Sequence, residues 1–319
     1  LLILLVGCLG ILGGCIASDD ETTKNEPSPN PVDEPEPVEE VEMSRPAFLR
    51  VPVAGYLGEG VEIPTPSPVP LDGELVGTKS NVGEGLRVLV DSIHAHNFLG
   101  NGLTPDEYDY HKLHGPSRAI NYLRSRDVAV DEVREGRITS ELLTGYDMLF
   151  LNLPSAEMPP FYFSEIAAIR NFIESGSGMF VFVDHSNAYF HSYRLAPLFE
   201  QLELETYLDT ACDEPPHTLG TGNAWISITD FRSHPVTEGV ECIGIQTGGP
   251  VDFPSAVAFT SEKSWHDRWN CGPYLANFNV SENKYDAGYY GNFTLDEDEK
   301  SGPMGVVAAK ELGEGRIVV

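Results

Sequence analysis

The sequence predicts an α/β protein built on a doubly wound, mostly parallel sheet. Short apolar runs rich in Val, Ile, Leu and Phe have the length of buried strands, and segments with helical spacing of apolar residues separate them. The strand runs lie at residues 87–93, 128–133, 146–153 and 179–183. Because strands that alternate with helices are joined by right-handed crossovers, we expect parallel pairing with helices on both faces.

Four helices are predicted between and after these strands, at residues 116–126, 139–143, 164–174 and 195–204. The third has a clear amphipathic pattern, because Ile166, Ile169 and Ile173 fall on one face. Ser164 is its predicted N-cap, since a serine side chain can accept a hydrogen bond from the first helical turn. From Trp225 onward the pattern changes to short strands and loops.

The composition is that of a folded but strongly acidic protein. Apolar residues make up 41% of the 319 residues and aromatic residues 10%, which is enough for a hydrophobic core. The chain has 49 acidic and 20 basic residues, so its formal net charge is −29. This balance excludes a nucleic-acid-binding protein that works by neutralising phosphates, because such proteins need a basic surface.

Residues 1–15 are predicted to be a lipoprotein signal peptide. The first 14 residues carry one uncharged apolar run, which is too short to span a bilayer as a helix. The run ends in the motif LGGC, which is similar to the lipobox of prokaryotic lipoproteins and predicts lipidation of Cys15. Cys8 matches the same pattern, but cleavage there would leave an apolar stub. The alternative is an ordinary cleaved signal or an uncleaved anchor helix.

The rest of the chain divides into a linker and one domain. Residues 16–86 contain 15 acidic and four basic residues together with many prolines, which predicts a disordered N-terminal tether. Residues 87–319 are predicted to form the α/β domain. The chain begins without Met and ends inside a predicted strand, so we expect the domain to be truncated and to continue beyond Val319.

Five motifs follow one another along the chain: the first strand with its Asp91-x-x-His94 ending, the strand around Asp147, GSG at residues 176–178, SHPVTEGV at 233–240 and LGEGRIVV at 312–319. In this order they resemble the class I glutamine amidotransferase-like superfamily. ThuA-like and GldG-type domains are the most similar branches. The resemblance covers residues 87–319, and it implies a flavodoxin-like sheet closed by the last strand.

The resemblance does not extend to the catalytic cysteine of that superfamily. A Gly-x-Cys-x-Gly turn follows the equivalent strand there, whereas this chain has VDHSN at residues 183–187. Hydrolysis of glutamine through a thiolate is therefore not expected. Ser186 is a conceivable replacement nucleophile, but the flanking glycines of a nucleophile turn are missing. One disulfide among Cys212, Cys242 and Cys271 is compatible with an exported domain, and the pairing stays open.

Polar residues follow two of the predicted strands. Because ligands bind beyond the carboxyl ends of parallel strands, these residues are expected to meet at one edge of the sheet, with Asp91 and His185 in one pocket. We call the set the carboxyl-edge cluster: Asp91, His94, His96, Asp184 and His185. The three histidines are candidate ligands of a divalent metal, which the carboxylates would complete. The alternative is that these residues are hydrogen-bonded groups that close the ends of buried strands.

Two functional hypotheses follow. In the first, the protein is anchored to the cell membrane through lipidated Cys15, on the extracytoplasmic face, and its non-catalytic domain binds a small polar ligand, a glycan or an envelope protein. In the second, the domain is a metal-dependent or other hydrolase that uses the carboxyl-edge cluster. The sequence contains no confident cofactor motif, and the lost cysteine favours the first hypothesis.

Overall fold

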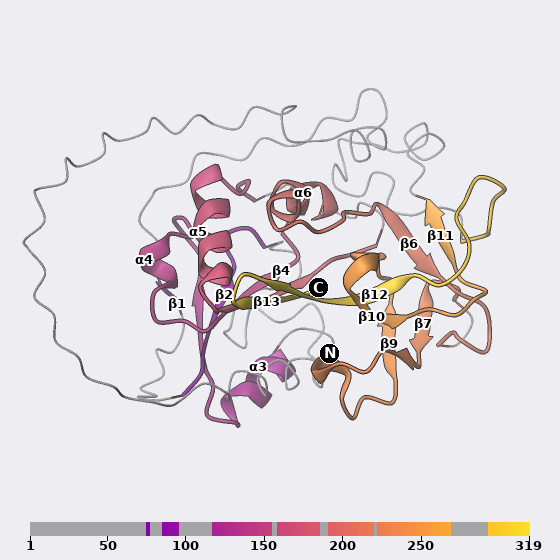
Figure 1. The fold of residues 1–319 in the computed structure, drawn as a ribbon, viewed down its shortest axis with the longest axis horizontal. Coiled ribbons are helices and arrows are strands. Elements are labelled where there is room, and N and C mark those ends of the chain that lie inside the picture. Colours follow the sequence, from indigo (N-terminus) through magenta and orange to yellow (C-terminus); the bar gives the residue numbers. More distant parts are fainter. Residues whose placement is uncertain are drawn as a thin grey trace, which may run out of the picture.

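A nine-stranded sheet forms the centre of the protein (Figure 1). The computed structural model describes residues 75–76, 85–95, 117–154, 158–185, 191–219, 222–268 and 293–319. The strand order is β1-β3-β2-β4-β5-β13-β12-β10-β8. The strands are β1 (Leu75–Val76), β2 (Arg87–Asp91), β3 (Ala129–Val133), β4 (Met148–Asn152), β5 (Gly178–Phe182), β8 (Asp230–Phe231), β10 (Ala256–Phe259), β12 (Gly305–Leu312) and β13 (Gly315–Val318).

The predicted parallel sheet is confirmed for the core of this arrangement. Strands β3, β2, β4, β5 and β13 pair in parallel, each with its neighbour in the order. Strands β12, β10 and β8 continue the sheet in antiparallel pairing. At the other edge β1 pairs antiparallel with β3. The segment predicted to be a linker therefore contributes one short edge strand; the signal peptide and Cys15 lie outside the described residues.

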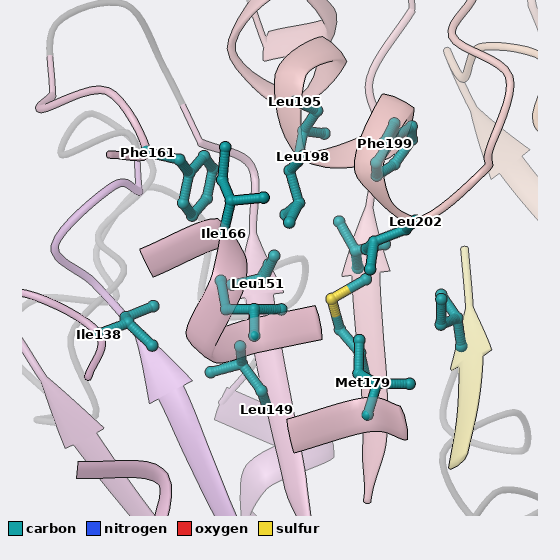
Figure 2. Close-up of a cluster of buried hydrophobic side chains, with 14 of the residues drawn as sticks. Ile138, Leu149, Leu151, Phe161, Ile166, Met179, Leu195, Leu198, Phe199 and Leu202 are labelled. Carbon is teal, nitrogen blue, oxygen red and sulfur yellow. The ribbon is translucent and has the colours of Figure 1, made fainter. Parts of the chain in front are cut away.

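The parallel strands are apolar on both faces because helices cover both. In β2, β4 and β5 alternate residues enter two different cores. Leu89, Leu149 and Met179 pack under α5 (Phe163–Glu174) and α6 (His191–Gln201), as Figure 2 shows for the latter two residues. The residues that alternate with these along each strand pack on the opposite face of the sheet, with α3 (Ser117–Arg124). The predicted strands are thus buried on both faces, as their runs of consecutive apolar residues require.

Helix α4 (Ser140–Leu143) is short and is capped as its sequence suggests, since Thr139 accepts a hydrogen bond from the Leu142 amide at 3.1 Å. The predicted N-cap of α5 is wrong. The helix begins at Phe163, so Ser164 lies inside its first turn and Tyr162 precedes the helix. Glu165 accepts a hydrogen bond from the Tyr162 amide at 2.9 Å, and a side chain from within the helix replaces the expected serine cap.

The last two strands join the parallel and antiparallel parts of the sheet, so the LGEGRIVV segment lies inside the sheet and does not close it as expected. The β12–β13 hairpin turns at Gly313, whose φ of 61° suits glycine. Strand β13 then pairs in parallel with β5. The backbone of Gly315 lies so close to the end of α5 that an added Cβ would be 1.9 Å from the Ile173 carbonyl oxygen. A side chain at this position would therefore separate the hairpin from the helix.

Two smaller sheets lie beside the antiparallel end of the central sheet (Figure 1). One joins β6 (Asp209–Cys212) to β11 (Trp265–Arg268), and the other joins β7 (Trp225–Ile228) to β9 (Ile243–Gln246). Two 3-10 turns, η4 (Pro235–Thr237) and η5 (Phe253–Ser255), complete this region. In the part of the chain that the structure describes, no helix has the length and apolar character needed to cross a membrane.

Candidate functional site

The carboxyl ends of β2, β4 and β5 meet at one edge of the sheet, as predicted. Asp91 is the last residue of β2, and Asp184 and His185 follow β5. Since both strands run parallel to β4 between them, Asp91 and His185 lie at the same edge. The expected strand directions are confirmed. His96 and Ser186 lie outside the described residues.

The first polar network at this edge joins the end of β2 to the start of α5. His94 Nδ1 donates to Asp91 Oδ2 at 2.9 Å, and His94 Nε2 lies 3.5 Å from Glu165 Oε2. The ring of His94 stacks on Phe161 with 4.0 Å between the ring centroids. The side chains of Asp91, His94 and Glu165 are at most 1% exposed. A histidine is therefore held between two carboxylates inside the protein.

This arrangement fixes the charge of His94. Burial alone would lower its pKa, but the carboxylates of Asp91 and Glu165 outweigh burial and raise the pKa from 6.5 to about 10. Burial alone would raise the pKa of Glu165, but His94 and two backbone amides outweigh burial, so the pKa of this carboxyl is lowered. At neutral pH the ring is an imidazolium, protonated on both nitrogens, with Nδ1 hydrogen-bonded to Asp91 and Nε2 facing the Glu165 carboxylate. A protonated ring has no lone pair for a metal, so His94 cannot be a metal ligand in this state.

The sequence pattern does not single out Glu165, although it is central to this network. It belongs to α5, far along the chain from His94, and its two oxygens also accept the amides of Ile138 and Tyr162 at 2.8 and 2.9 Å. The one signal available is its position in the first turn of a predicted helix, where a glutamate often caps the backbone. Its partnership with His94 depends on how α5 packs on the sheet.

The second network gathers two histidines around Asp184. The His185 amide donates to Asp184 Oδ1 at 2.7 Å, and the His185 Nε2 lies 3.6 Å from the same oxygen. His191, the first residue of α6, places its Nε2 3.8 Å from Asp184 Oδ2 and donates from Nδ1 to the Pro154 carbonyl. Burial lowers the pKa of His191, with Asp184 and Pro154 opposing, so this ring is neutral at pH 7.

The two networks are neighbours through the end of β4. A β-bridge joins Ala95 to Pro154, the residue whose carbonyl holds His191. Leu153, between β4 and Pro154, has a φ of 51°, which is costly for a branched side chain. The side chain of Asp184 is 20% exposed, whereas those of Asp91 and His94 are buried. Of the carboxylates of Asp91, Glu165 and Asp184, which the structure describes, that of Asp184 is therefore the one that a ligand in solution can reach.

Metal and cysteine chemistry find little support in the described part of the chain. Its His, Cys, Asp and Glu residues form no group of three or more that could hold a metal ion. Cys212 and Cys242 are both free thiols, the former buried and the latter exposed. Burial, with Asp267 nearby, raises the pKa of Cys212, which makes it a poor nucleophile. Cys271 lies outside the described residues.

No protein-family model and no curated protein matches this sequence. Solved structures that are similar to it include two that each align with 73% of this chain. The mmIFT52 N-terminal domain has 13% sequence identity and a TM-score of 0.45, with 84% of that chain covered. The cytoplasmic protein STM1381 from Salmonella typhimurium LT2 has 11% identity and a TM-score of 0.37, with 86% covered. These distant likenesses assign no family to the chain.

Proposed function

We propose that this protein is an extracytoplasmic lipoprotein, anchored to the cell membrane through Cys15, whose α/β domain is a non-catalytic binding module. In this proposal the sheet is of the doubly wound, flavodoxin-like type found in class I amidotransferase-like domains, without their catalytic cysteine. The ligand is a small polar molecule, a glycan or an envelope protein, and it binds at the carboxyl edge of the sheet.

One observation carries the binding proposal: the charged groups at this edge form one fully buried network and a second network that contains a partly exposed carboxylate. His94 is held between Asp91 and Glu165, so these groups are committed to the fold. Asp184 remains as a partly exposed carboxylate, and the buried rings of His185 and His191 lie beside it. This carboxylate can accept hydrogen bonds from a polar ligand, and the thiolate nucleophile of the amidotransferase-like enzymes is absent from the turn after β5.

The anchoring part of the proposal makes a direct prediction. Changing Cys15 to serine is expected to release the protein from the membrane fraction and to abolish incorporation of labelled palmitate, because the thiol that carries the acyl chain is gone. The matched control is Cys8→Ser, which is expected to keep both properties. Membrane retention and acyl labelling that survive in the Cys15 variant would contradict the lipoprotein assignment.

The binding part is tested by thermal unfolding of the full chain with saccharides, amino acids and short peptides at millimolar concentration. A ligand of the native state adds about 2.7 kcal/mol of stability at about 100 times its Kd. We expect at least one compound to raise the Tm of the wild type and to act less on Asp184→Asn. Mass spectrometry after overnight incubation should recover that compound unchanged. Its conversion to a product would instead support the second candidate.

The second candidate is a hydrolase that uses the same edge, and one observation favours it: two histidines flank the partly exposed carboxylate of Asp184. A carboxylate and histidines placed together can take up and release protons during hydrolysis. Metal dependence would require further ligands beyond the described residues, because no metal-holding group is present among them. Stoichiometric Zn, Mn or Fe that is lost on changing His185 to alanine would favour this candidate.

A further inference from the structure

A cavity of about 470 Å³ lies beside the β6–β11 sheet, and none of the described residues of the carboxyl-edge cluster lines it. Its size is within the range of sites for small molecules. The lining residues that matter here are Glu205, Tyr207, Asp209, His266, Arg268 and Lys300. Asp209 and Arg268 pair across the two strands, and His266 precedes Arg268 by two residues, so their side chains lie on one face of this small sheet.

A buried acid–histidine pair lines this cavity. His266 Nδ1 lies 3.1 Å from Asp209 Oδ2, and the two residues are 7% and 8% exposed. The other carboxylate oxygen, Oδ1, is buried and receives no hydrogen bond from the residues that the structure describes. Its charge is thus only partly compensated, which is costly at a site largely withdrawn from water.

The contact with Asp209 determines whether the Nε2 of His266 donates or accepts a hydrogen bond. When the neutral ring donates its Nδ1 proton to Asp209, its Nε2 carries a lone pair and acts as an acceptor. Among the described residues none forms a hydrogen bond with this Nε2. The ring is more than nine-tenths buried and lines the cavity. In this tautomer of the ring, a ligand beside it is held by donating a hydrogen bond to Nε2.

Tyr207 adds a second acceptor. Its ring centroid lies 5.9 Å from that of His266, and its hydroxyl donates to Glu205. Burial and the Glu205 carboxylate raise the pKa of Tyr207 above its ordinary value, so the hydroxyl keeps its proton. Because that proton is used toward Glu205, the phenol oxygen retains only its lone pairs for other partners.

Two cations, those of Arg268 and Lys300, line the cavity beside four carboxylates, those of Glu205, Asp209, Asp298 and Glu299. Arg268 Nη1 donates to Asp298 Oδ2 at 2.8 Å, and the Arg268 amide donates to Glu299 at 2.7 Å. The Lys300 ammonium lies 5.7 Å from the centre of the Phe253 ring. Carboxylates therefore outnumber cations in the lining, and this balance, like the net charge of −29 for the whole chain, favours a cationic ligand over an anion.

We propose that this cavity is a binding site for an organic ammonium ion that carries N–H donors, such as a primary amine. Its N–H groups would donate to the His266 Nε2 and to the Tyr207 oxygen, and its positive charge would compensate the Asp209 carboxylate. This site is additional to the carboxyl edge, and it stands whether or not the proposed function there is correct.

The test is calorimetric titration of the full chain at low ionic strength with butane-1,4-diamine and with its hexamethylated bis-quaternary analogue. The two ions have equal charge, but the quaternary ion has no N–H to donate. We expect the diamine to bind at least about tenfold more tightly than the analogue, because hydrogen bonds between a charged donor and its acceptor are among the stronger ones.

Three variants locate the site, each checked for folding by its thermal unfolding curve. Asp209→Asn removes the buried charge and His266→Phe removes the acceptor while keeping a ring. Each is expected to weaken diamine binding about tenfold. Glu241→Gln removes one exposed charge outside the cavity and is the matched control, with unchanged affinity expected.

The outcomes separate the possibilities. No diamine binding, or equal affinity for the two ions, overturns the proposal, because the attraction would then be absent or one of charge alone. Binding that is lost in Asp184→Asn but kept in Asp209→Asn also overturns it and assigns the amine to the carboxyl edge. If a folded His266→Phe protein binds the diamine as the wild type does, the acceptor role of His266 is wrong.

Discussion

Replacing His94 with leucine is expected to lower the free energy of unfolding by about 3 to 5 kcal/mol, which is the usual cost of removing one partner from a buried ion pair. The change leaves the carboxylates of Asp91 and Glu165 without their shared cation, and both are withdrawn from water. It also removes the ring that stacks on Phe161, a member of the core in Figure 2. Urea unfolding at pH 7 measures the loss.

His191→Leu is the matched control, because His191 is as deeply buried as His94 but neutral at pH 7. Removing the His191 ring leaves Asp184 without this neighbour, but Asp184 is partly exposed and can be hydrated. A smaller loss of unfolding free energy, about 1 to 2 kcal/mol, is therefore expected. Equal losses in the two variants would show that burial of a ring, rather than its charge, is what matters at His94.

The pH dependence gives an independent readout of the same charge. The pKa of His94 is raised from 6.5 to about 10 on folding. The stabilisation is therefore complete below pH 6.5 and is lost as the pH rises through 10. Wild-type stability should fall across this alkaline range, and the fall should be much smaller in His94→Leu. A wild-type protein whose stability is flat from pH 6.5 to 10 would refute the buried imidazolium.

Gly315→Ala is expected to destabilise the protein by at least about 3 kcal/mol, at or above the upper end of ordinary overpacking. The new Cβ would lie 1.9 Å from the Ile173 carbonyl oxygen and 2.3 Å from that of Ser177. Both contacts are with backbone, which cannot rotate away as a side chain could. The β12–β13 hairpin must then move away from α5 and β5, with a fall in Tm of about 6 to 12 °C.

Gly178→Ala, at the start of β5, is the control from the same region. A Cβ there meets nothing closer than 3.6 Å, which is ordinary contact, so a change within about 1 kcal/mol is expected. Similar Tm values for both variants and the wild type would mean that the hairpin does not pack against α5 as closely as described.

The local elements of this fold follow from patterns within short windows of sequence. Runs such as VLV in β2 and MFVF in β5 are apolar at consecutive positions, which is what a strand buried on both faces requires. The alternation of these strands with helices fixed their direction, and that placed Asp91 and Asp184 at the same edge. Two helix starts were exceptions: Glu165 lies within α5 and accepts the amide of Tyr162 there, and α6 begins at His191 and ends at Gln201 rather than spanning residues 195–204.

The chemistry of the site depended on contacts between distant parts of the chain. His94 is charged because α5 brings Glu165 to it, and Asp184 meets His191 because α6 begins beside β5. Asp209 and His266 are 57 residues apart and meet only through the pairing of β6 with β11. Strand and helix periodicity depend on near neighbours, so sequence alone determines them. Protonation and partnership depend on burial and on charges from other elements, which only the packed structure brings together.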